Sequence, residues 1–223
     1  IGHYHQGVPI SCIQHPISGR ELKLNKPKKT ENPKKILVAG GGPGGMKAAA
    51  VAAEKGHQVI LCEKAGQLGG QVLLAQMLPE RREFGVMIDN LKREMELCSV
   101  EVRLNTYVDK AMVDIEKPDD IIISTGAEPF QSDAEISKKT HVVESWKVIQ
   151  NNGGTGNSVV IADWRCDYIG MGLAEMLAKD GCDVRLAVDG THAGQNLQLY
   201  MRDNWIGRLD HLGVKVIPYA RLF

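Results

Sequence analysis

The stretch ILVAGGGPGGMKAAA at residues 36–50 constrains the fold more than any other part of this sequence. An apolar run is followed by Gly40, Gly42 and Gly45 in the pattern G-x-G-x-x-G, and then by small helix-forming residues. In such a strand, turn and helix, the first glycine permits the turn and the second lets the backbone approach a pyrophosphate. The third lets the helix pack on the strand. The pattern predicts a dinucleotide-binding α/β unit.

A carboxylate stands where the second strand of that unit should end. VILCE at residues 59–63 predicts this strand, and Glu63 follows the glycines by about 20 residues, where an acid can accept hydrogen bonds from both ribose hydroxyls. The acid would also repel a 2′-phosphate, which favours FAD, NAD or ADP over NADP. The alternative is an ordinary glycine turn with Glu63 as a surface charge. The combination of strand, spacing, helix and acid favours the nucleotide site.

Strands and helices alternate along the chain, which predicts an α/β fold with Rossmann-like parallel sheets and two nested dinucleotide-binding-type units. We expect a segment and linker at 1–34, a nucleotide-binding unit at 35–150 and a second, incomplete unit at 151–223. The other expected elements are a helix at 82–98, a buried strand with a glycine turn at 119–129, a strand at 159–162, a helix at 169–179 and a strand at 183–188.

Composition excludes several classes of function. Lys plus Arg and Asp plus Glu balance at 27 each, so no net field attracts nucleic acid or an anionic membrane. No apolar run has the length of a membrane span, and the first residues given lack the n-region and h-region typical of a signal peptide, so we expect a cytoplasmic protein. The cysteines are widely spaced, which predicts reduced thiols. The chain opens without Met and closes on the strand-like run VKVIPYARLF, so we expect a fragment of a larger protein.

Residues 40–72 resemble the flavin-binding segment of the NADH:flavin oxidoreductases, which join an old-yellow-enzyme barrel to a C-terminal nucleotide-binding region. Trimethylamine dehydrogenase and 2,4-dienoyl-CoA reductase belong to this family. EKAGQLGGQ at 63–71 matches its E-(K/R)-x-x-x-L-G-G-Q motif, and STGAEP at 124–129 matches its (A/S)-T-G-A-x-P turn. Within the family, the chain is most similar to demethylases of tertiary amines such as dimethylglycine or N-methylproline.

The resemblance implies an oxidoreductase whose FMN lies in a barrel outside this chain, so we expect no catalytic residue for substrate chemistry here. It implies FAD or ADP in this region, an electron acceptor such as an electron-transfer flavoprotein, and a homo-oligomer at full length. The expected nucleotide-binding residues are Gly40, Gly42, Pro43, Gly45, Glu63, Lys64, Gly70, Gln71, Val108, Thr125 and Gly126.

The same resemblance implies a 4Fe–4S cluster. Family members bind it through C-x2-C-x3-C-x11-C, with the last cysteine followed by a segment like NPxxGRE. Here Cys12 is followed by IQHPISGRE, so Cys12 would be the fourth thiolate ligand and the other three would lie upstream of Ile1. The alternative is an isolated cysteine. We interpret His3, His5 and His15 as surface or linker residues, because no acidic or cysteine pattern supports them as metal ligands.

The stretch VVIADWRCDYIGMGLAE at 159–175 has the outline of a second nucleotide turn without its glycines. Asp163, Trp164 and Arg165 stand where the backbone would touch phosphate, and we expect Asp163 to face the phosphates and repel them. Trimethylamine dehydrogenase has a similarly degraded second unit and takes its electrons from substrate. The second unit is then retained for packing or for docking an electron acceptor. Asp163 and Asp167 as a catalytic acid/base pair are the alternative reading.

Three functions remain open from the sequence. The first is the nucleotide-binding region of an iron–sulfur flavoprotein that demethylates a small tertiary amine. The second is an NAD(P)H-dependent reductase of the enoate or dienoyl-CoA type. The third is a non-redox domain that binds ADP as a scaffold.

Overall fold

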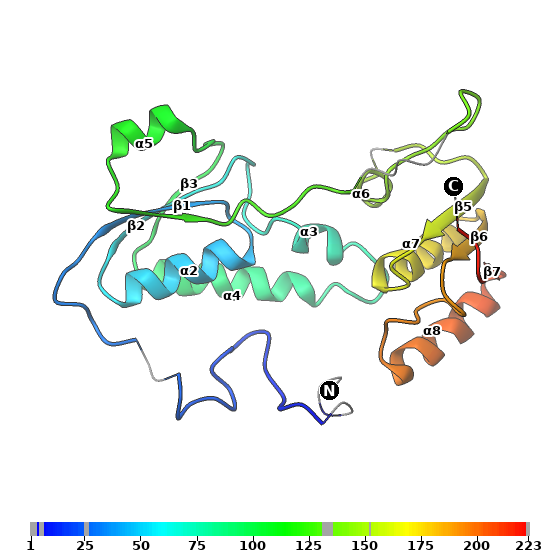
Figure 1. Cartoon of the computed structure of the whole chain (residues 1–223), viewed down its shortest axis with the longest axis horizontal. Coiled ribbons are helices and arrows are strands. Elements are labelled where there is room, and N and C mark those ends of the chain that lie inside the picture. The colour runs from blue at the N-terminus through cyan, green and yellow to red at the C-terminus, as the bar shows by residue number, and fades with distance from the viewer. Residues whose placement is uncertain (1–3, 5–6, 25–26, 131–135, 152, 222–223) are drawn as a thin grey trace. The chain divides into compact units, whose positions relative to one another are not determined.

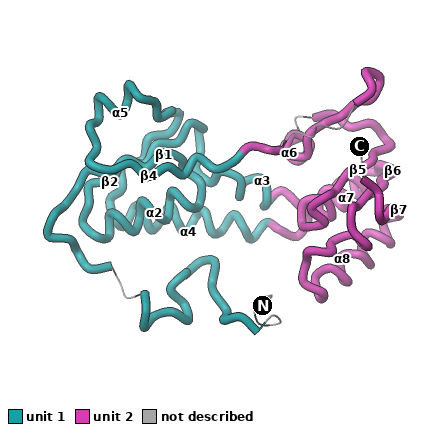
Figure 2. Tube along the Cα trace, in the orientation of Figure 1, with its two compact units in different colours: residues 1–76, 82–127 teal, residues 77–81, 128–223 magenta. Residues whose placement is uncertain are grey.

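The structure is a computed structural model that describes residue 4 and residues 7–24, 27–130, 136–151 and 153–221. The chain folds as two compact α/β units, which Figure 2 distinguishes by colour. Unit 1 comprises residues 1–76 and 82–127, and unit 2 comprises residues 77–81 and 128–223. Each unit contains a parallel sheet, as the alternation of strands and helices predicted.

Unit 1 is a four-stranded parallel sheet in the order β3-β2-β1-β4, with helices on both faces (Figure 1). The register pairs Ala39 at the end of β1 with Cys62 at the end of β2, so the residues that follow these strands emerge side by side. The elements are β1 (Lys35–Ala39), α2 (Pro43–Glu54), β2 (Gln58–Cys62), α3 (Val72–Ala75), α4 (Phe84–Leu97), β3 (Glu101–Arg103), α5 (Lys110–Glu116) and β4 (Asp120–Ile123).

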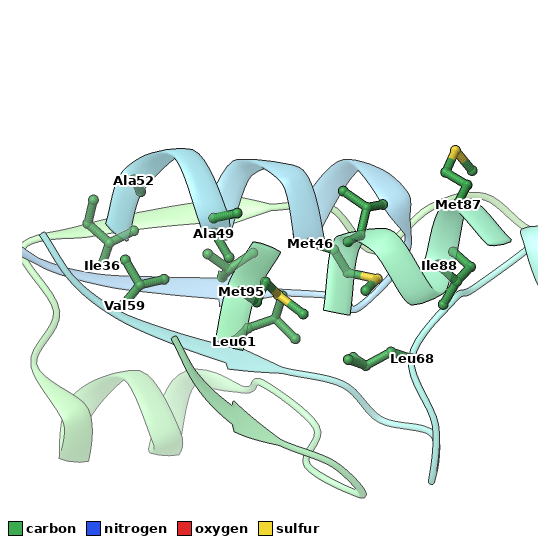
Figure 3. Packing of buried hydrophobic residues seen from close by; sticks show 13 residues of the cluster. Ile36, Met46, Ala49, Ala52, Val59, Leu61, Leu68, Met87, Ile88 and Met95 are labelled. Atoms are coloured by element: carbon green, nitrogen blue, oxygen red, sulfur yellow. The ribbon is translucent and has the colours of Figure 1, made fainter. Parts of the chain in front are cut away.

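The main core of unit 1 lies between the sheet and the helices α2 and α4 (Figure 3). Alternate residues of β1 and β2 point to this face, as the pleat of a strand requires. The apolar residues of α4 recur at helical spacing and meet them, so the predicted helix at 82–98 is confirmed with slightly shorter bounds. The buried members are Ile36, Val38, Met46, Ala49, Ala50, Ala52, Val59, Leu61, Leu68, Met87, Ile88, Leu91 and Met95.

The opposite face of the sheet carries a smaller core. Leu37, Ile60 and Cys62 are buried there against partly buried Val108 and residues of α5. Helix α5 is capped by Asp109, whose carboxylate accepts from the backbone N–H of Met112 at 2.8 Å. With both faces of β1 and β2 covered, these two strands read as continuous apolar runs in the sequence.

The strand expected within residues 119–129, ahead of a glycine turn, is present, but the expectation that it is buried is wrong. Strand β4 covers Asp120–Ile123 and forms the edge of the sheet beside β1. Ile121 is 43% exposed and Ile123 is 78% exposed. An apolar run alone does not distinguish a central strand from an edge strand, because both have high β-propensity.

Unit 2 is a three-stranded parallel sheet in the order β5-β6-β7. Helix α7 packs on β5, on β6 and on α8. The segment 77–81, which joins α3 to α4 in the sequence, belongs to this unit, and Leu78 is buried in it. The elements are α6 (Ser145–Ile149), β5 (Ser158–Asp163), α7 (Tyr168–Lys179), β6 (Asp183–Val188), α8 (Leu199–His211) and β7 (Lys215–Ile217).

A buried carboxylate fixes α7 against α8. Glu175 is fully buried, and it accepts from Trp205 Nε1 at 2.7 Å and from an Arg208 Nη at 3.1 Å. Lys179 pairs with its other oxygen at 2.7 Å. Arg208 also pairs with Glu80, so the segment from the α3–α4 connection joins the same network. A buried charge is tolerated only when it is paired in this way.

Two further expectations concern the chain as a whole. Across the described residues, no helix is long and apolar enough to cross a membrane. All five cysteines lie among the described residues and are free thiols in the structure: Cys12, Cys62, Cys98, Cys166 and Cys182.

Candidate nucleotide-binding site

The glycine turn of unit 1 has the geometry that its sequence predicted. Gly40 has a φ of 107°, a left-handed conformation that favours glycine, and its N–H donates to the Cys62 carbonyl at 2.8 Å. A Cβ on Gly45 would overlap the carbonyl oxygen of Gly40, so this glycine allows the start of α2 to pack on the turn. At Gly42, by contrast, no atom lies within 4 Å of the position that a Cβ would take.

The acid after β2 is joined to this turn. Glu63 is 8% exposed, and its Oε2 accepts from the Gly41 N–H at 2.6 Å while its Oε1 accepts from the Ala65 N–H at 2.8 Å. Each carboxylate oxygen has a second lone pair, so Glu63 can still accept from a ribose hydroxyl. A Cβ on Gly41 would come within 2.5 Å of Leu68 Cδ2 and 3.0 Å of Glu63 Cβ, so a larger residue at this position would have to displace the Leu68 side chain. The G-x-G-x-x-G pattern does not express this close packing.

The loop after β2 returns across the glycine turn. The Gly69 N–H donates to the Gly41 carbonyl at 2.9 Å. Gly70 has a φ of 52°, and a Cβ on it would lie 3.1 Å from the Gly42 Cα. The next residue, Gln71, donates its side-chain amide to the Ala127 carbonyl at 3.1 Å. The L-G-G-Q motif therefore places backbone directly beside the turn.

The turn after β4 closes the other side. Ser124 Oγ lies 2.9 Å from the Ala39 carbonyl oxygen and 3.1 Å from the Gly40 carbonyl oxygen, and its hydroxyl donates to them. Thr125 and Gly126 follow and are exposed, with Gly126 at a φ of 78°. Parallel strands place their carboxyl ends at one edge, where ligands of open α/β sheets bind.

Helix α2 begins with an uncapped N-terminus. Its N-cap is Gly42, no side chain caps it, and Pro43 occupies the first helical position. The first N–H groups of a helix carry partial positive charge and lack intrahelical acceptors. Because Gly42 itself has no Cβ, its side of the helix N-terminus is open and has the chemistry to hold a pyrophosphate. Glu63 has the chemistry to hold a ribose. The residues present therefore fit an adenine nucleotide.

The structure brings most of the expected residues to this one edge of the sheet. Three segments contribute them. The turn after β1 and the start of α2 hold Gly40, Gly42, Pro43 and Gly45, the loop after β2 holds Glu63, Lys64, Gly70 and Gln71, and the turn after β4 holds Thr125 and Gly126. Val108 instead packs against Leu37, Ile60 and Cys62 in the smaller core. Sequence reasoning missed Gly41 and Ser124, although the run of three glycines and the first residue of STGAEP were available as signals.

The turn of unit 2 supplies its own anion. Asp167 is the N-cap of α7, and its Oδ1 accepts from the Ile169 N–H at 2.9 Å. Arg165 pairs with the other oxygen of Asp167 at 2.7 Å. Counting along the chain, Asp167 stands at the N-cap that Gly42 occupies in unit 1. Gly170, three residues after its N-cap, corresponds to Gly45.

The expectation that Asp163 faces the phosphates is wrong. Asp163 ends β5, is 6% exposed, and turns inward, so that a Cβ on Gly170 would overlap its carboxylate. Its Oδ1 accepts from the N–H groups of Arg165 at 3.2 Å and Cys166 at 2.9 Å. Burial raises the pKa of Asp163 to about 6. Asp163 therefore takes N–H groups of the turn, and Asp167 is the carboxylate that lies at the N-terminus of α7.

The loop after β6 covers the turn of unit 2. Asn196 donates its backbone N–H to the Cys166 carbonyl at 3.0 Å and its side-chain amide to the Arg165 carbonyl at 2.6 Å. The loop after β2 makes the equivalent approach in unit 1, through Gly69. The two units thus share the packing of loop on turn, but only unit 1 leaves the helix N-terminus open.

The described part of the N-terminal segment holds two of the side chains considered as metal ligands, Cys12 and His15. Cys12 is partly exposed, and His15 lies 3.1 Å through its Nδ1 from Ser18 Oγ. Within the part of the chain that the structure describes, no three His, Cys, Asp or Glu side chains gather as metal ligands. His3 and His5 lie outside the described residues.

The fold and the turn of unit 1 define a Rossmann-type nucleotide-binding protein. A family model for the pyridine nucleotide-disulphide oxidoreductases matches residues 34–222, and the chain belongs to this family. It is thus an FAD/NAD-type binding region of a flavoprotein oxidoreductase related to demethylases and to enoate-type reductases.

Curated relatives that match the chain include a dehydrogenase, a demethylase and a reductase. The N,N-dimethylglycine/sarcosine dehydrogenase of Chromohalobacter salexigens is 35% identical over 87% of this chain and 29% of its own length. The probable N-methylproline demethylase of Rhizobium meliloti is 35% identical over 89% of this chain and 30% of its own. The bilirubin reductase of Mediterraneibacter gnavus is 36% identical over 78% of this chain and 27% of its own length. The chain spans under a third of each of these relatives.

Proposed function

We propose that unit 1 binds an adenine nucleotide, FAD or ADP, at its glycine turn. The observation that carries this is the contrast between the two turns, since α2 begins at Gly42 without a side-chain cap and α7 begins under the carboxylate of Asp167. The pyrophosphate would lie on the open N-terminus of α2 and a ribose would lie on Glu63. Thr125 and Gly126 would line the far side.

Analysis of the nucleotide released on denaturation tests this proposal. We expect FAD or ADP in stoichiometric amount, and we expect Gly42→Val to abolish it, because a side chain would occupy the position of the pyrophosphate. Gly156→Val is the matched control, since Gly156 is exposed and a Cβ there also meets no atom within 4 Å. Equal nucleotide content in the two variants would reject the site.

We further propose that the longer protein is an iron–sulfur flavoprotein that oxidatively demethylates a small tertiary amine. The functions of two relatives support this, the dimethylglycine/sarcosine dehydrogenase and the probable N-methylproline demethylase. A bound flavin would supply the redox chemistry, and this chain's own residues would bind and orient the nucleotide. An electron-transfer flavoprotein is the proposed acceptor, with unit 2 serving for packing or docking. A cytoplasmic homo-oligomer is the proposed assembly.

Cys12 is proposed as a ligand of a 4Fe–4S cluster in that longer protein. The support is the likeness of Cys12 and the IQHPISGRE that follows it to the family's last cluster ligand. Iron analysis decides the question. We expect the present chain to hold no iron and Cys12→Ala to reduce the iron of the longer protein, with Cys182→Ala as a control. An intact cluster in the Cys12→Ala protein would contradict the ligand role.

A second candidate is an NAD(P)H-dependent reductase, which the likeness to bilirubin reductase favours. Reduction of the longer protein by NADH or by a tertiary amine separates the two candidates. A colourless protein that releases ADP would instead indicate the non-redox scaffold.

A further inference from the structure

One side chain joins two of the three loops of the candidate site across the third. Gln71 belongs to the loop after β2 and Ala127 to the loop after β4, while the glycine turn follows β1, which lies between these strands in the sheet. The amide Nε2 of Gln71 donates to the Ala127 carbonyl oxygen at 3.1 Å. We call this hydrogen bond the Gln71 strap.

The strap lies close to the turn and to the loop on its far side. Gly70, the neighbour of Gln71, approaches Gly42 so closely that a Cβ on Gly70 would lie 3.1 Å from the Gly42 Cα. On the other side, a Cβ on Gly126 would lie 3.5 Å from Gln71 Nε2. Residues 70 and 71 therefore lead from the N-cap of α2 to the turn after β4.

The path of residues 70 and 71 bears on whether the site takes ADP or the longer FAD. The proposed site runs from Glu63, after β2, to the N-terminus of α2 at Gly42, after β1, and ADP ends there. A dinucleotide crosses from one side of the first strand to the other in a Rossmann-type unit. The flavin half of FAD would therefore continue toward β4, along the direction that the Gln71 strap spans.

We propose that Gln71 determines specificity between ADP and FAD: its strap to Ala127 must open for FAD and is not reached by ADP. This inference rests on the proposed function of unit 1. Gln71 is exposed, so its side chain can rotate into solvent without disturbing a core. The net free-energy contribution of a neutral hydrogen bond corresponds to about a threefold to tenfold change in affinity.

The test is a calorimetric titration of the nucleotide-free chain with FAD and with ADP. In Gln71→Met, a side chain of similar length cannot donate to Ala127, and Gln71→Ala removes the side chain altogether. We expect FAD to bind about threefold to tenfold more tightly to both variants than to the wild type, with a much smaller change for ADP. Gln67→Ala, an exposed glutamine of the same loop, is the control and should leave the ratio of the two affinities unchanged.

The outcomes distinguish a failure of the strap inference from a failure of the proposed nucleotide site. If both nucleotides bind and the Gln71 variants change the two affinities equally, or weaken FAD, the strap inference is overturned and the site stands. If the wild type binds neither nucleotide, the proposed function fails and the inference fails with it. Should the alanine variant not fold, the methionine variant decides, because it keeps the length of the side chain.

Discussion

The backbone N–H of Gly41 donates to Glu63 Oε2 at 2.6 Å, so the acid after β2 is bonded directly to the turn after β1. The same carboxylate accepts from Ala65 through its other oxygen. Glu63 therefore has two tasks in the proposed site. It holds the shape of the turn, and it presents its remaining lone pairs to the ligand.

This double task predicts the effect of Glu63→Gln. One of the two backbone N–H groups would then face an amide N–H₂, and the charge that strengthens the hydrogen bonds would be lost. We expect affinity for ADP to fall about tenfold or more and the free energy of unfolding to fall by about 1–3 kcal/mol. Titration calorimetry and urea denaturation measure the two effects. Glu54→Gln, at an exposed carboxylate at the end of α2, is the control.

A purely structural glycine should behave differently. A Cβ on Gly45 would overlap the Gly40 carbonyl oxygen, which is backbone and cannot move aside. We expect Gly45→Ala to lower the stability of unit 1 by about 2–4 kcal/mol, and Gly42→Ala to leave it within about 1 kcal/mol. Hydrogen exchange of the amides of β1 and α2 distinguishes the two variants. Equal protection in both would contradict the close packing at Gly45.

The sequence predicted the parts of the fold that depend on local pattern. The apolar runs that became β1, β2 and β6 lie in buried sheet, and α2 begins at the glycine turn, as the G-x-G-x-x-G pattern predicted. The exposure of Ile123 depends on what covers an edge strand, which is not local information. The membership of residues 77–81 in unit 2 depends on Glu80 and Leu78 meeting residues distant in sequence. No local pattern could reveal it.

The site was predictable to a similar degree. The G-x-G-x-x-G pattern has a known physical role at each glycine, so the positions of Gly40, Gly42 and Gly45 followed from it. The direction in which Asp163 points did not, because three residues separate β5 from the N-cap of α7 and only two separate β1 from Gly42. The longer turn lets Asp163 fold back onto the N–H groups of Arg165 and Cys166.

The buried Asp163 predicts a dependence of unit 2 stability on pH. Its pKa rises from 3.8 to about 6, first because of burial and also because of the neighbouring Asp167, while the N–H bonds of Cys166 and Arg165 and the charge of Arg165 oppose the rise. A carboxyl group whose pKa is raised by folding contributes to the free energy of unfolding, and this contribution is complete below pH 4. The contribution is lost as the pH rises through about 6, by roughly 3 kcal/mol in all.

Asp163→Asn measures this contribution. Trp146, Trp164 and Trp205 are all the tryptophans of the chain and all lie in unit 2, so tryptophan fluorescence during urea denaturation reports on this unit. We expect the wild type to lose stability relative to Asp163→Asn between pH 4 and pH 7. Asp180→Asn, at an exposed aspartate after α7, should parallel the wild type. A constant difference between wild type and Asp163→Asn would disprove a raised pKa.

NADH and NADPH should not bind to unit 2 at the N-terminus of α7. A pyrophosphate at that N-terminus would meet the carboxylate of Asp167, and two unit charges 4 Å apart repel by about 4 kcal/mol at an effective dielectric constant of 20. Arg165 offsets part of this repulsion through its pair with Asp167, but its side chain is 79% exposed, so the compensation is screened by water. The N–H groups of Arg165, Cys166 and Ile169 already donate to Asp163 and Asp167, which leaves fewer donors for a phosphate.

Because unit 1 could itself accept the ADP half of NADH, the titration is made with ADP already saturating the chain. Under that condition we expect no saturable binding of NADH or NADPH up to millimolar concentration. We also expect the longer protein to be reduced far more slowly by either nucleotide than by a tertiary amine. Asp167→Gly restores at α7 the uncapped glycine that begins α2, so any pyrophosphate binding that this variant gains measures what the carboxylate excludes. Rapid and saturable reduction of the unaltered longer protein by NADH would instead place it with the reductases, and Asp167 would then be no barrier to the nucleotide.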